Sequence, residues 1–253
     1  MIDLAILFTE QLQGMFWPAV LCFLRIGAAV TILPGIGESG IPARVRLALA
    51  LALTVIVLPL HPAPATQDAT ILAAGAEVLT GLLLGLALRL MILGLQTAAA
   101  IAAQTMSLAQ LFATAGAEPQ PALGTLFTMA AIALAFEAGL HVKLSALFIL
   151  SYDLVPVGRF ASTPDMLSWG SGAVSTATAL AFSLALPFVI IGMLWNIALG
   201  AVNRAMPQLM VAFIGAPALA LGSLVLAALF APLILMIWVA EFDLVLSSPF
   251  AVE

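Results

Sequence analysis

The chain has 253 residues, of which 64% are hydrophobic and 8% are charged, and its formal net charge at pH 7 is −5. A soluble domain carries about 25% charged residues, so twelve acidic and seven basic side chains are too few for a water-facing surface. The charged residues are scattered singly and form no basic patch, which excludes nucleic acid as a partner. The mean hydropathy of +1.24 indicates a protein embedded in membrane lipid.

Six apolar stretches are long enough for membrane-spanning helices, which need roughly 20 residues to cross about 30 Å of hydrocarbon. They lie at residues 15–35, 43–60, 71–112, 122–150, 173–203 and 209–246. Their runs are continuous and rich in Ala and Leu, which favours helices over the alternating strands of a membrane barrel. The polar stretch 151–172 is too short for a second domain, so the sequence predicts one all-α polytopic domain over residues 1–253.

The first stretch is expected to stay in the protein. Asp3 and Glu10 precede it and no basic residue comes before Arg25, so the positive segment of a cleaved signal peptide is missing. Cys22 is the only cysteine of the chain, and its apolar surroundings predict a small buried hydrophobic residue.

Five charged residues need an explanation: Arg25, Glu77, Arg89 and Glu137, which lie inside the apolar stretches, and Arg204, which directly follows the fifth stretch. A charge at hydrocarbon depth costs at least about 2.5–3.5 kcal/mol, so each needs a partner, a water-lined path or a subunit contact. The alternative is a side chain that reaches the membrane surface, which fits Glu77 and Arg204 near segment ends. For Arg25 and Arg89 we expect buried pairing.

Glu137 and His141 stand four residues apart, which on one helical face could indicate a proton relay or two metal ligands. Two ligands do not make a zinc site, so no metal is expected. The sequence also lacks GxSxG, HExxH, Cys-x-x-Cys and phosphate-binding glycine motifs. We therefore expect no enzymatic activity and no cofactor.

Prolines and glycines interrupt the apolar stretches. Helix-breaking prolines occur at Pro18, Pro187, Pro217 and Pro232. In lipid the freed backbone carbonyls need partners, so broken helices are expected to be buried in protein or to line a cavity. Gly81 and Gly85 are spaced by one helical turn, which favours close approach of a second helix.

Arginines give the orientation. Arg44 and Arg46 lie in the first loop and Arg204 in the fifth, against Arg159 alone in the fourth. Because cytoplasmic loops carry the excess of Lys and Arg, this pattern predicts that both termini lie outside.

Several residue strings give the chain a more particular resemblance. They are Leu24-Arg25 leading to Pro34, Ile41-Pro42-Ala43-Arg44-Val45-Arg46 before an Ala/Leu helix ending at Leu58-Pro59, Glu77 with Gly81 and Gly85, Gly139-Leu140-His141 ahead of Pro156-Val157-Gly158, and Asn203-Arg204-Ala205-Met206-Pro207-Gln208-Leu209 before Gly215 and Pro217. In this succession the chain resembles the FliR family of flagellar type III export-gate subunits. It departs from the family at Ala103-Gln104-Thr105-Met106-Ser107, where the family usually shows glycines around Gln-Met-Gly.

The resemblance implies an assembly in the bacterial inner membrane at the flagellar basal body. FliR-like subunits join FliP-like and FliQ-like subunits in a gate that passes unfolded flagellar proteins, with an FlhB-like subunit around its cytoplasmic entrance. The helices of such subunits form inclined hairpins that build a closed pore, much of it above the bilayer. Buried charges would then face other subunits instead of lipid.

The resemblance also implies a plug. FliR-like chains place a loop from the region after the third stretch inside the pore, and this role falls on Met106, Leu111 and Phe112. A flexible thioether and bulky apolar groups suit a constriction that excludes ions by dewetting. The alternative is an ordinary turn packed against adjacent helices.

Two other functions stay open. One is the homologous subunit of a virulence injectisome, which is physically the same device with other exported proteins. The second is a secondary transporter whose broken helices form a midplane substrate site. The lack of a clear inverted repeat in the sequence speaks against a transporter.

Overall fold

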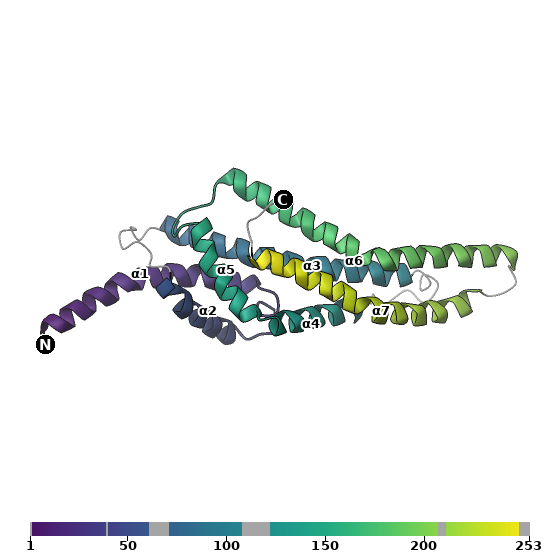
Figure 1. Ribbon diagram of the computed structural model, residues 1–253, viewed down its shortest axis with the longest axis horizontal. Coiled ribbons are helices and arrows are strands. Elements are labelled where there is room, and N and C mark those ends of the chain that lie inside the picture. Colours follow the sequence, from purple (N-terminus) through teal and green to yellow (C-terminus); the bar gives the residue numbers. More distant parts are fainter. Residues whose placement is uncertain (1, 39, 61–70, 108–121, 207–210, 248–253) are drawn as a thin grey trace. The chain divides into compact units, whose positions relative to one another are not determined.

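The structure is a computed structural model that describes residues 2–38, 40–60, 71–107, 122–206 and 211–247. Within these residues all regular structure is helical, and strands are absent (Figure 1). The helices are α1 (Ile2–Ile32), α2 (Ala43–Val57), the short 3-10 helix η1 (Leu58–Leu60), α3 (Ile71–Ser107), α4 (Ala122–Glu137), α5 (Leu140–Leu154), α6 (Thr163–Ala205) and α7 (Val211–Ser247). The predicted all-α class is confirmed.

Besides the start of α1, which lies at Ile2 and not at residue 15, two helix boundaries differ markedly from the prediction. The stretch 122–150 is divided into α4 and α5, which are bent by 75° at the break. Gly139 causes the break, because its φ of +84° is a left-handed conformation that ends one helix and that glycine adopts without a Cβ clash. The other difference is α6, which begins at Thr163 and not at residue 173. Pro164 follows at once, and a proline is tolerated in the first turn of a helix, where its missing N–H would have no partner within the helix.

By length and composition, four helices of the described chain could cross a membrane, or five if the bent pair of α4 and α5 counts as one span. The four are Ala43–Leu60, Ile71–Thr105, Met166–Ala205 and Leu224–Ser247. Phe16–Ile32 of α1 is a shorter apolar helix. Together these segments correspond to the six predicted stretches, so the predicted number of spans is approximate and the apolar segments themselves are confirmed.

Contacts divide the chain into two compact units, and α3, α4, α6 and α7 contribute to both. The first unit comprises Met1–Leu90, Ala135–Ala173 and Phe242–Glu253. In it α1 lies alongside the first half of α3, and α2 packs against α1 and α5 (Figure 1). Its core contains Leu21, Ile26, Leu33, Leu84 and Phe148.

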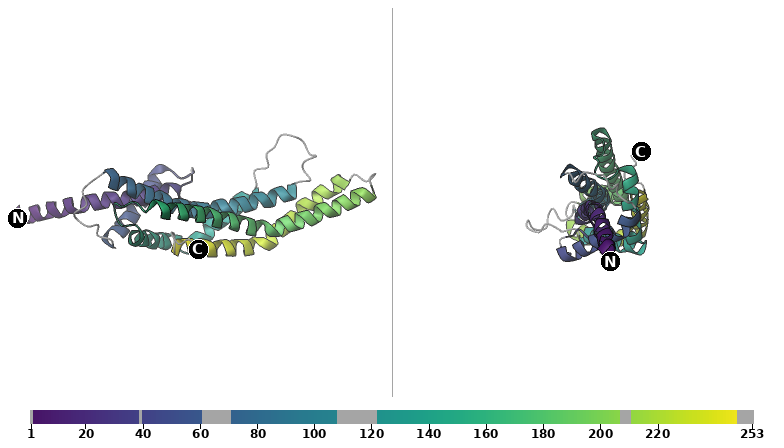
Figure 2. Two further views of the ribbon diagram at one scale, coloured as in Figure 1. Left: turned by 90° about the horizontal axis from the view of Figure 1, so that it is seen from above. Right: turned by 90° about the vertical axis from the view of Figure 1, so that its left-hand side faces the viewer.

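The second unit comprises Met91–Leu134 and Val174–Glu241. Here α6 and α7 run side by side (Figure 2), and the rings of Phe188 and Phe230 meet edge to face at 6.2 Å. The indole Nε1 of Trp238 donates to the Met91 carbonyl at 2.9 Å, which ties α7 to α3. The single domain expected from the sequence stays a prediction.

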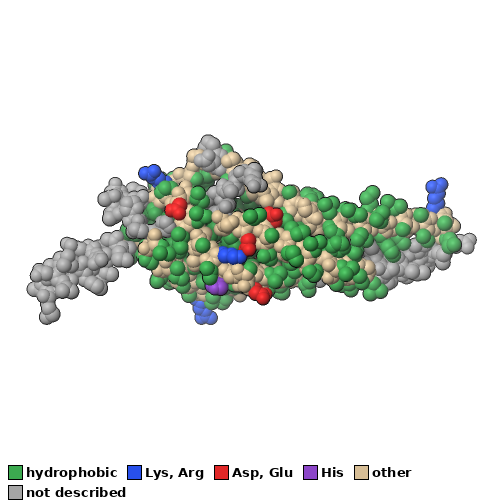
Figure 3. Space-filling view, in the orientation of Figure 1, with side chains coloured by type: hydrophobic (Ala, Val, Ile, Leu, Met, Phe, Trp, Pro, Cys, Tyr) green, Lys and Arg blue, Asp and Glu red, His purple; other side chains and the backbone are tan. Residues whose placement is uncertain are grey.

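Apolar side chains cover much of the described surface. In Figure 3 hydrophobic groups dominate the visible face and charges are few. On α7 the exposed residues include Leu221, Leu224, Val225, Leu229, Leu233 and Met236. Only 17% of the apolar window of α7 and 22% of that of α2 is buried inside the chain. Such a surface requires lipid or partner subunits around it.

Candidate functional site

Arg25 of α1 and Glu77 of α3 form an ion pair at the centre of the first unit. Arg25 Nε donates to Glu77 Oε2 at 2.7 Å, and Nη2 donates to Oε1 at 3.1 Å. Both side chains are fully buried. This two-pronged geometry matches the planar guanidinium to the planar carboxylate, which a lysine cannot do.

The remaining donors of Arg25 reach α5 and the loop that follows it. Nη1 donates to Ser151 Oγ at 3.1 Å, and Nη2 donates to the Val155 carbonyl at 2.9 Å. The guanidinium also stacks on the Tyr152 ring, with 3.8 Å between its carbon and the ring centroid. Stacking of this kind adds cation–π attraction where water is excluded.

Glu77 is held from a second side, since the backbone N–H of Gly158 donates to its Oε1 at 2.7 Å. We call the group formed by Arg25, Glu77, Ser151, Tyr152 and the backbone of residues 155–158 the Arg25 cluster. It joins α1, α3, α5 and the loop after α5. A buried ion pair offsets its desolvation only when its other donors and acceptors are also bonded. Here all three nitrogens of the Arg25 guanidinium and both carboxylate oxygens of Glu77 form hydrogen bonds.

Two glycines of α3 let the helix approach α1 closely. A Cβ on Gly81 would lie far inside van der Waals contact with the Arg25 carbonyl oxygen, and one on Gly85 would lie 2.7 Å from the Ala29 carbonyl oxygen. Gly81 and Gly85 follow Glu77 at intervals of four residues, so all three lie along one side of the helix. The close approach brings Glu77 within reach of Arg25.

Arg89 continues this spacing by four more residues. Its Nη1 is hydrogen-bonded to Glu38 Oε1, in the turn after α1, with the two side chains 27% and 39% exposed. One side of α3 therefore contacts α1 and the turn after it. Along this side two glycines, Gly81 and Gly85, lie between two charged residues, Glu77 and Arg89. All four residues stand out in the sequence, but neither their common spacing nor the partner Glu38 was predicted.

A third ion pair was not expected from the sequence. Lys143 of α5 donates to both carboxylate oxygens of Asp243 on α7, at 2.7 and 2.8 Å. The side chains are 35% and 41% exposed, so water weakens the attraction. A lysine and an aspartate that lie 100 residues apart give no signal in a single sequence.

Two expectations about charges are corrected. Glu77 does not reach the membrane surface, because it is fully buried against Arg25. Glu137 and His141 do not share one helical face, because α4 ends at Glu137 and the left-handed Gly139 separates the two helices. Both side chains are exposed. Arg204 is also exposed, in the last turn of α6, where a cation interacts favourably with the helix dipole.

The plug residues Leu111 and Phe112 lie outside the described residues, and so does the side chain of Met106. Among the described residues no three His, Cys, Asp or Glu side chains come together in a way that could hold a metal ion. The polar groups that the structure does bring together hold helices to one another. The Arg25 cluster is therefore a structural centre, which fixes the arrangement of the first unit.

Comparison with known proteins places the chain in a family. Residues 16–245 match the family described as bacterial export proteins, family 1. The chain is 33% identical over 227 residues to the flagellar biosynthetic protein FliR of Caulobacter vibrioides, and the aligned region covers 87% of this chain and 90% of the relative. It is 30% identical over 222 residues to FliR of Escherichia coli, covering 85% of this chain and 83% of the relative.

Its apolar helices, several of them long enough to span a bilayer, and its internally paired charges define a polytopic α-helical membrane protein. With the family match over most of its length, the class is that of bacterial export proteins. The chain belongs to the FliR family.

Proposed function

We propose that this chain is a pore-forming subunit of the flagellar type III export gate in the bacterial inner membrane. It assembles with FliP-like and FliQ-like subunits, and an FlhB-like subunit docks at the cytoplasmic entrance. The complex passes unfolded flagellar proteins across the membrane. The role is structural, with no bond made or broken by the chain itself.

The family match over residues 16–245 carries the proposal. The relatives described above, and a third from Pectobacterium carotovorum at 28% identity over 211 residues, are all named flagellar biosynthetic proteins. Their names favour a flagellar system over a virulence injectisome. A secondary transporter is not supported by any observation on the described residues.

Surface character supports an assembly. The described chain presents exposed apolar residues on α2, α6 and α7, while its most buried charges are satisfied internally at the Arg25 cluster. Lipid or the apolar helices of other subunits can cover such a surface. Charges left exposed, such as Arg204 and Glu137, are then available for partner chains.

The gate itself is assigned to the segment that begins in the last turn of α3. Met106, Leu111 and Phe112 form a deformable apolar plug, which keeps ions and protons out of the pore at rest and yields to a passing chain. This assignment rests on the sequence of the segment and on the family resemblance, together with the physical ability of apolar constrictions to exclude water.

Co-expression tests the assembly. The full chain with an affinity tag is produced alone and together with the FliP-like and FliQ-like proteins of the same bacterium, and each preparation is extracted in mild detergent. We expect aggregation of the chain alone and a monodisperse complex from co-expression, because its apolar surface and broken helices need partners. As a control, an unrelated polytopic membrane protein with the same tag is co-expressed with the same two partners at an equal expression level.

Secretion tests the export role. A strain lacking the gene should fail to release hook and filament proteins into the medium, and the gene on a plasmid should restore their release. A monodisperse, protease-resistant single chain that captures neither partner would contradict the assembly. Normal secretion in the deletion strain would contradict the export role.

A further inference from the structure

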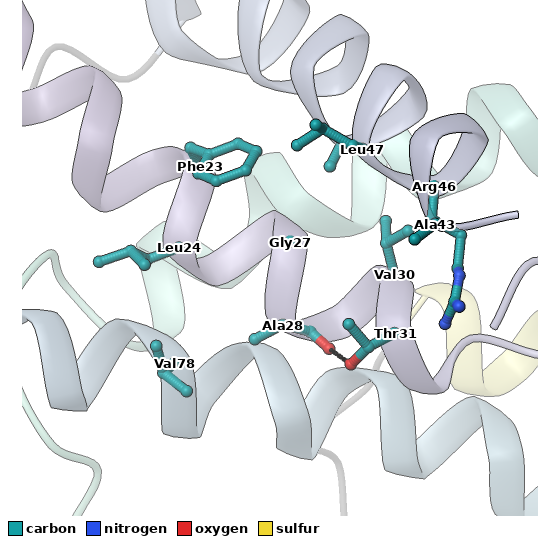
Figure 4. A pocket seen from close by; sticks show the side chains of 11 residues that line it. Phe23, Leu24, Gly27, Ala28, Val30, Thr31, Ala43, Arg46, Leu47 and Val78 are labelled. Atoms are coloured by element: carbon teal, nitrogen blue, oxygen red, sulfur yellow. Dashed lines mark hydrogen bonds between the residues drawn. The ribbon is translucent and has the colours of Figure 1, made fainter.

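A pocket of about 450 Å³ lies between α1 and α2 in the first unit, with one residue of α3 at its edge (Figure 4). This volume is typical of sites that hold a small organic molecule, about 300–1,000 Å³. Its lining is mostly apolar and consists of Phe23, Leu24, Gly27, Ala28, Val30, Thr31, Ala43, Arg46, Leu47, Ala50 and Val78. No residue of this lining is acidic.

Arg46 gives the pocket a charged end. In Figure 4 its side chain extends at one end of the pocket, near Thr31 and Val30, while Phe23 and Leu24 lie toward the other. Its Nε is shielded from water and has no hydrogen-bond partner. A shielded guanidinium N–H without an acceptor costs free energy, and an anion bound at this end would remove that cost.

The start of α2 adds to the positive potential. The helix begins after Pro42 without a side-chain cap and without an acidic residue in its first turn. Instead, this turn contains Arg44 and Arg46, at the end of the helix where the backbone dipole is already positive. Among the described residues neither arginine has an ion-pair partner. The arrangement is unfavourable in isolation and favourable around a bound anion.

An anion with a hydrocarbon tail fits both parts of this site. We propose that the pocket binds one anionic phospholipid, with the phosphate at Arg46 and the first turn of α2 and an acyl chain against Phe23, Leu24 and Leu47. A free phosphate would leave the apolar pocket unfilled. A zwitterionic lipid would bring an ammonium group toward two arginines with no carboxylate in the lining to receive it.

The position in the chain agrees with a lipid. Ala43–Leu60 is one of the helices that could span the membrane, and only 22% of its apolar window is buried. The arginines stand at the first turn of that segment, where a spanning helix meets the headgroup layer. Basic pockets between membrane helices at this depth bind anionic headgroups. The inference is independent of the proposed export role.

Lipid retention tests the site. The full chain, with the partner subunits that co-purify, is reconstituted in nanodiscs of equal dioleoylphosphatidylglycerol and dioleoylphosphatidylcholine, extracted in mild detergent, and its retained lipids are counted by native mass spectrometry. Arg46→Gln removes the charge at the pocket. Gly27→Leu fills the pocket without changing charge, since a Cβ there meets only the Phe23 ring at 3.8 Å.

Two matched variants serve as controls. Arg159→Gln removes an exposed arginine that does not line the pocket, and Gly200→Leu adds the same side chain to α6 where nothing lies within 4 Å of a Cβ. We expect the wild type and both controls to retain phosphatidylglycerol preferentially. Arg46→Gln should weaken retention about tenfold, as expected for loss of a hydrogen bond to a charged group. Gly27→Leu should abolish retention.

Several results would overturn the proposal. Equal retention of the two lipids shows a nonspecific apolar groove, and release of the lipid by inorganic phosphate shows a headgroup-only site. Unchanged retention in both Arg46→Gln and Gly27→Leu excludes the pocket. A photocrosslinker in place of Leu47, which is half-exposed in the lining, is expected to give lipid adducts in cells. Adducts to a protein chain would show that a partner subunit occupies the pocket instead.

Discussion

Arg25 and Glu77, which are 52 residues apart in the chain, form a doubly hydrogen-bonded ion pair with both side chains fully buried. Around this pair Ser151, the Val155 carbonyl and the Gly158 N–H complete the hydrogen bonding. Because four segments of the first unit meet at this buried pair, loss of the pair should destabilise the whole unit.

Single removal of either charge is expected to be severe. Arg25→Met or Glu77→Leu leaves the other charge buried without its partner, at a cost of about 3–5 kcal/mol. We expect each single variant to fail to accumulate in membranes and the double variant to recover partly, since it buries no lone charge. Immunoblotting of membrane fractions and the thermal midpoint in detergent measure this. Single variants with normal levels would show that water reaches the cluster.

The glycines of α3 should tolerate no side chain. Gly81→Ala or Gly85→Ala forces α3 away from the Arg25 or Ala29 carbonyl, and overpacking of this kind costs about 1–3 kcal/mol. The matched control is Gly200→Ala on α6, which has open space and should leave stability equal or slightly raised. The thermal midpoint of the purified complex is the measurement. If Gly81→Ala and Gly200→Ala behave alike, the close approach of α1 and α3 is wrong.

Arg204 is expected to hold a carboxylate or helix-end carbonyls on a partner chain. It is exposed in the last turn of α6, so its side chain is open to contact by a partner chain. Arg204→Ala should lower the yield of complex and reduce swimming, and Arg204→Lys should restore them only in part because lysine lacks the fork geometry. If both variants assemble and swim normally, the arginine only sets topology.

Deletion of residues 106–115 distinguishes a plug from a packing turn. A plug that closes the pore predicts a complex that assembles and lets small ions leak, because the apolar constriction is gone. A packing turn predicts loss of assembly. The complex yield and the membrane conductance of cells or liposomes decide between them, with a deletion of residues 62–69 as a control for loop shortening. An assembled complex without added leakage would rule out the plug.

Composition and periodicity alone determined the class of this protein. Lipid accepts few charges and no unpaired backbone, so an apolar chain without alternation has to be a set of helices, and its stretches gave most helix positions. The same cost of burial marked Arg25 and Glu77 as residues that need an explanation. The quoted strings pointed to the FliR family, which the family match over residues 16–245 confirms.

Tertiary structure decided which groups meet. Arg25 bonds to residues 52, 126 and 130 positions away, and no spacing in one sequence tells which side of a helix faces which neighbour. The break at Gly139 was equally hidden, because glycine costs only about 1 kcal/mol inside a helix and so does not by itself end one. Its φ of +84° separates Glu137 from His141, and only the folded backbone shows that angle.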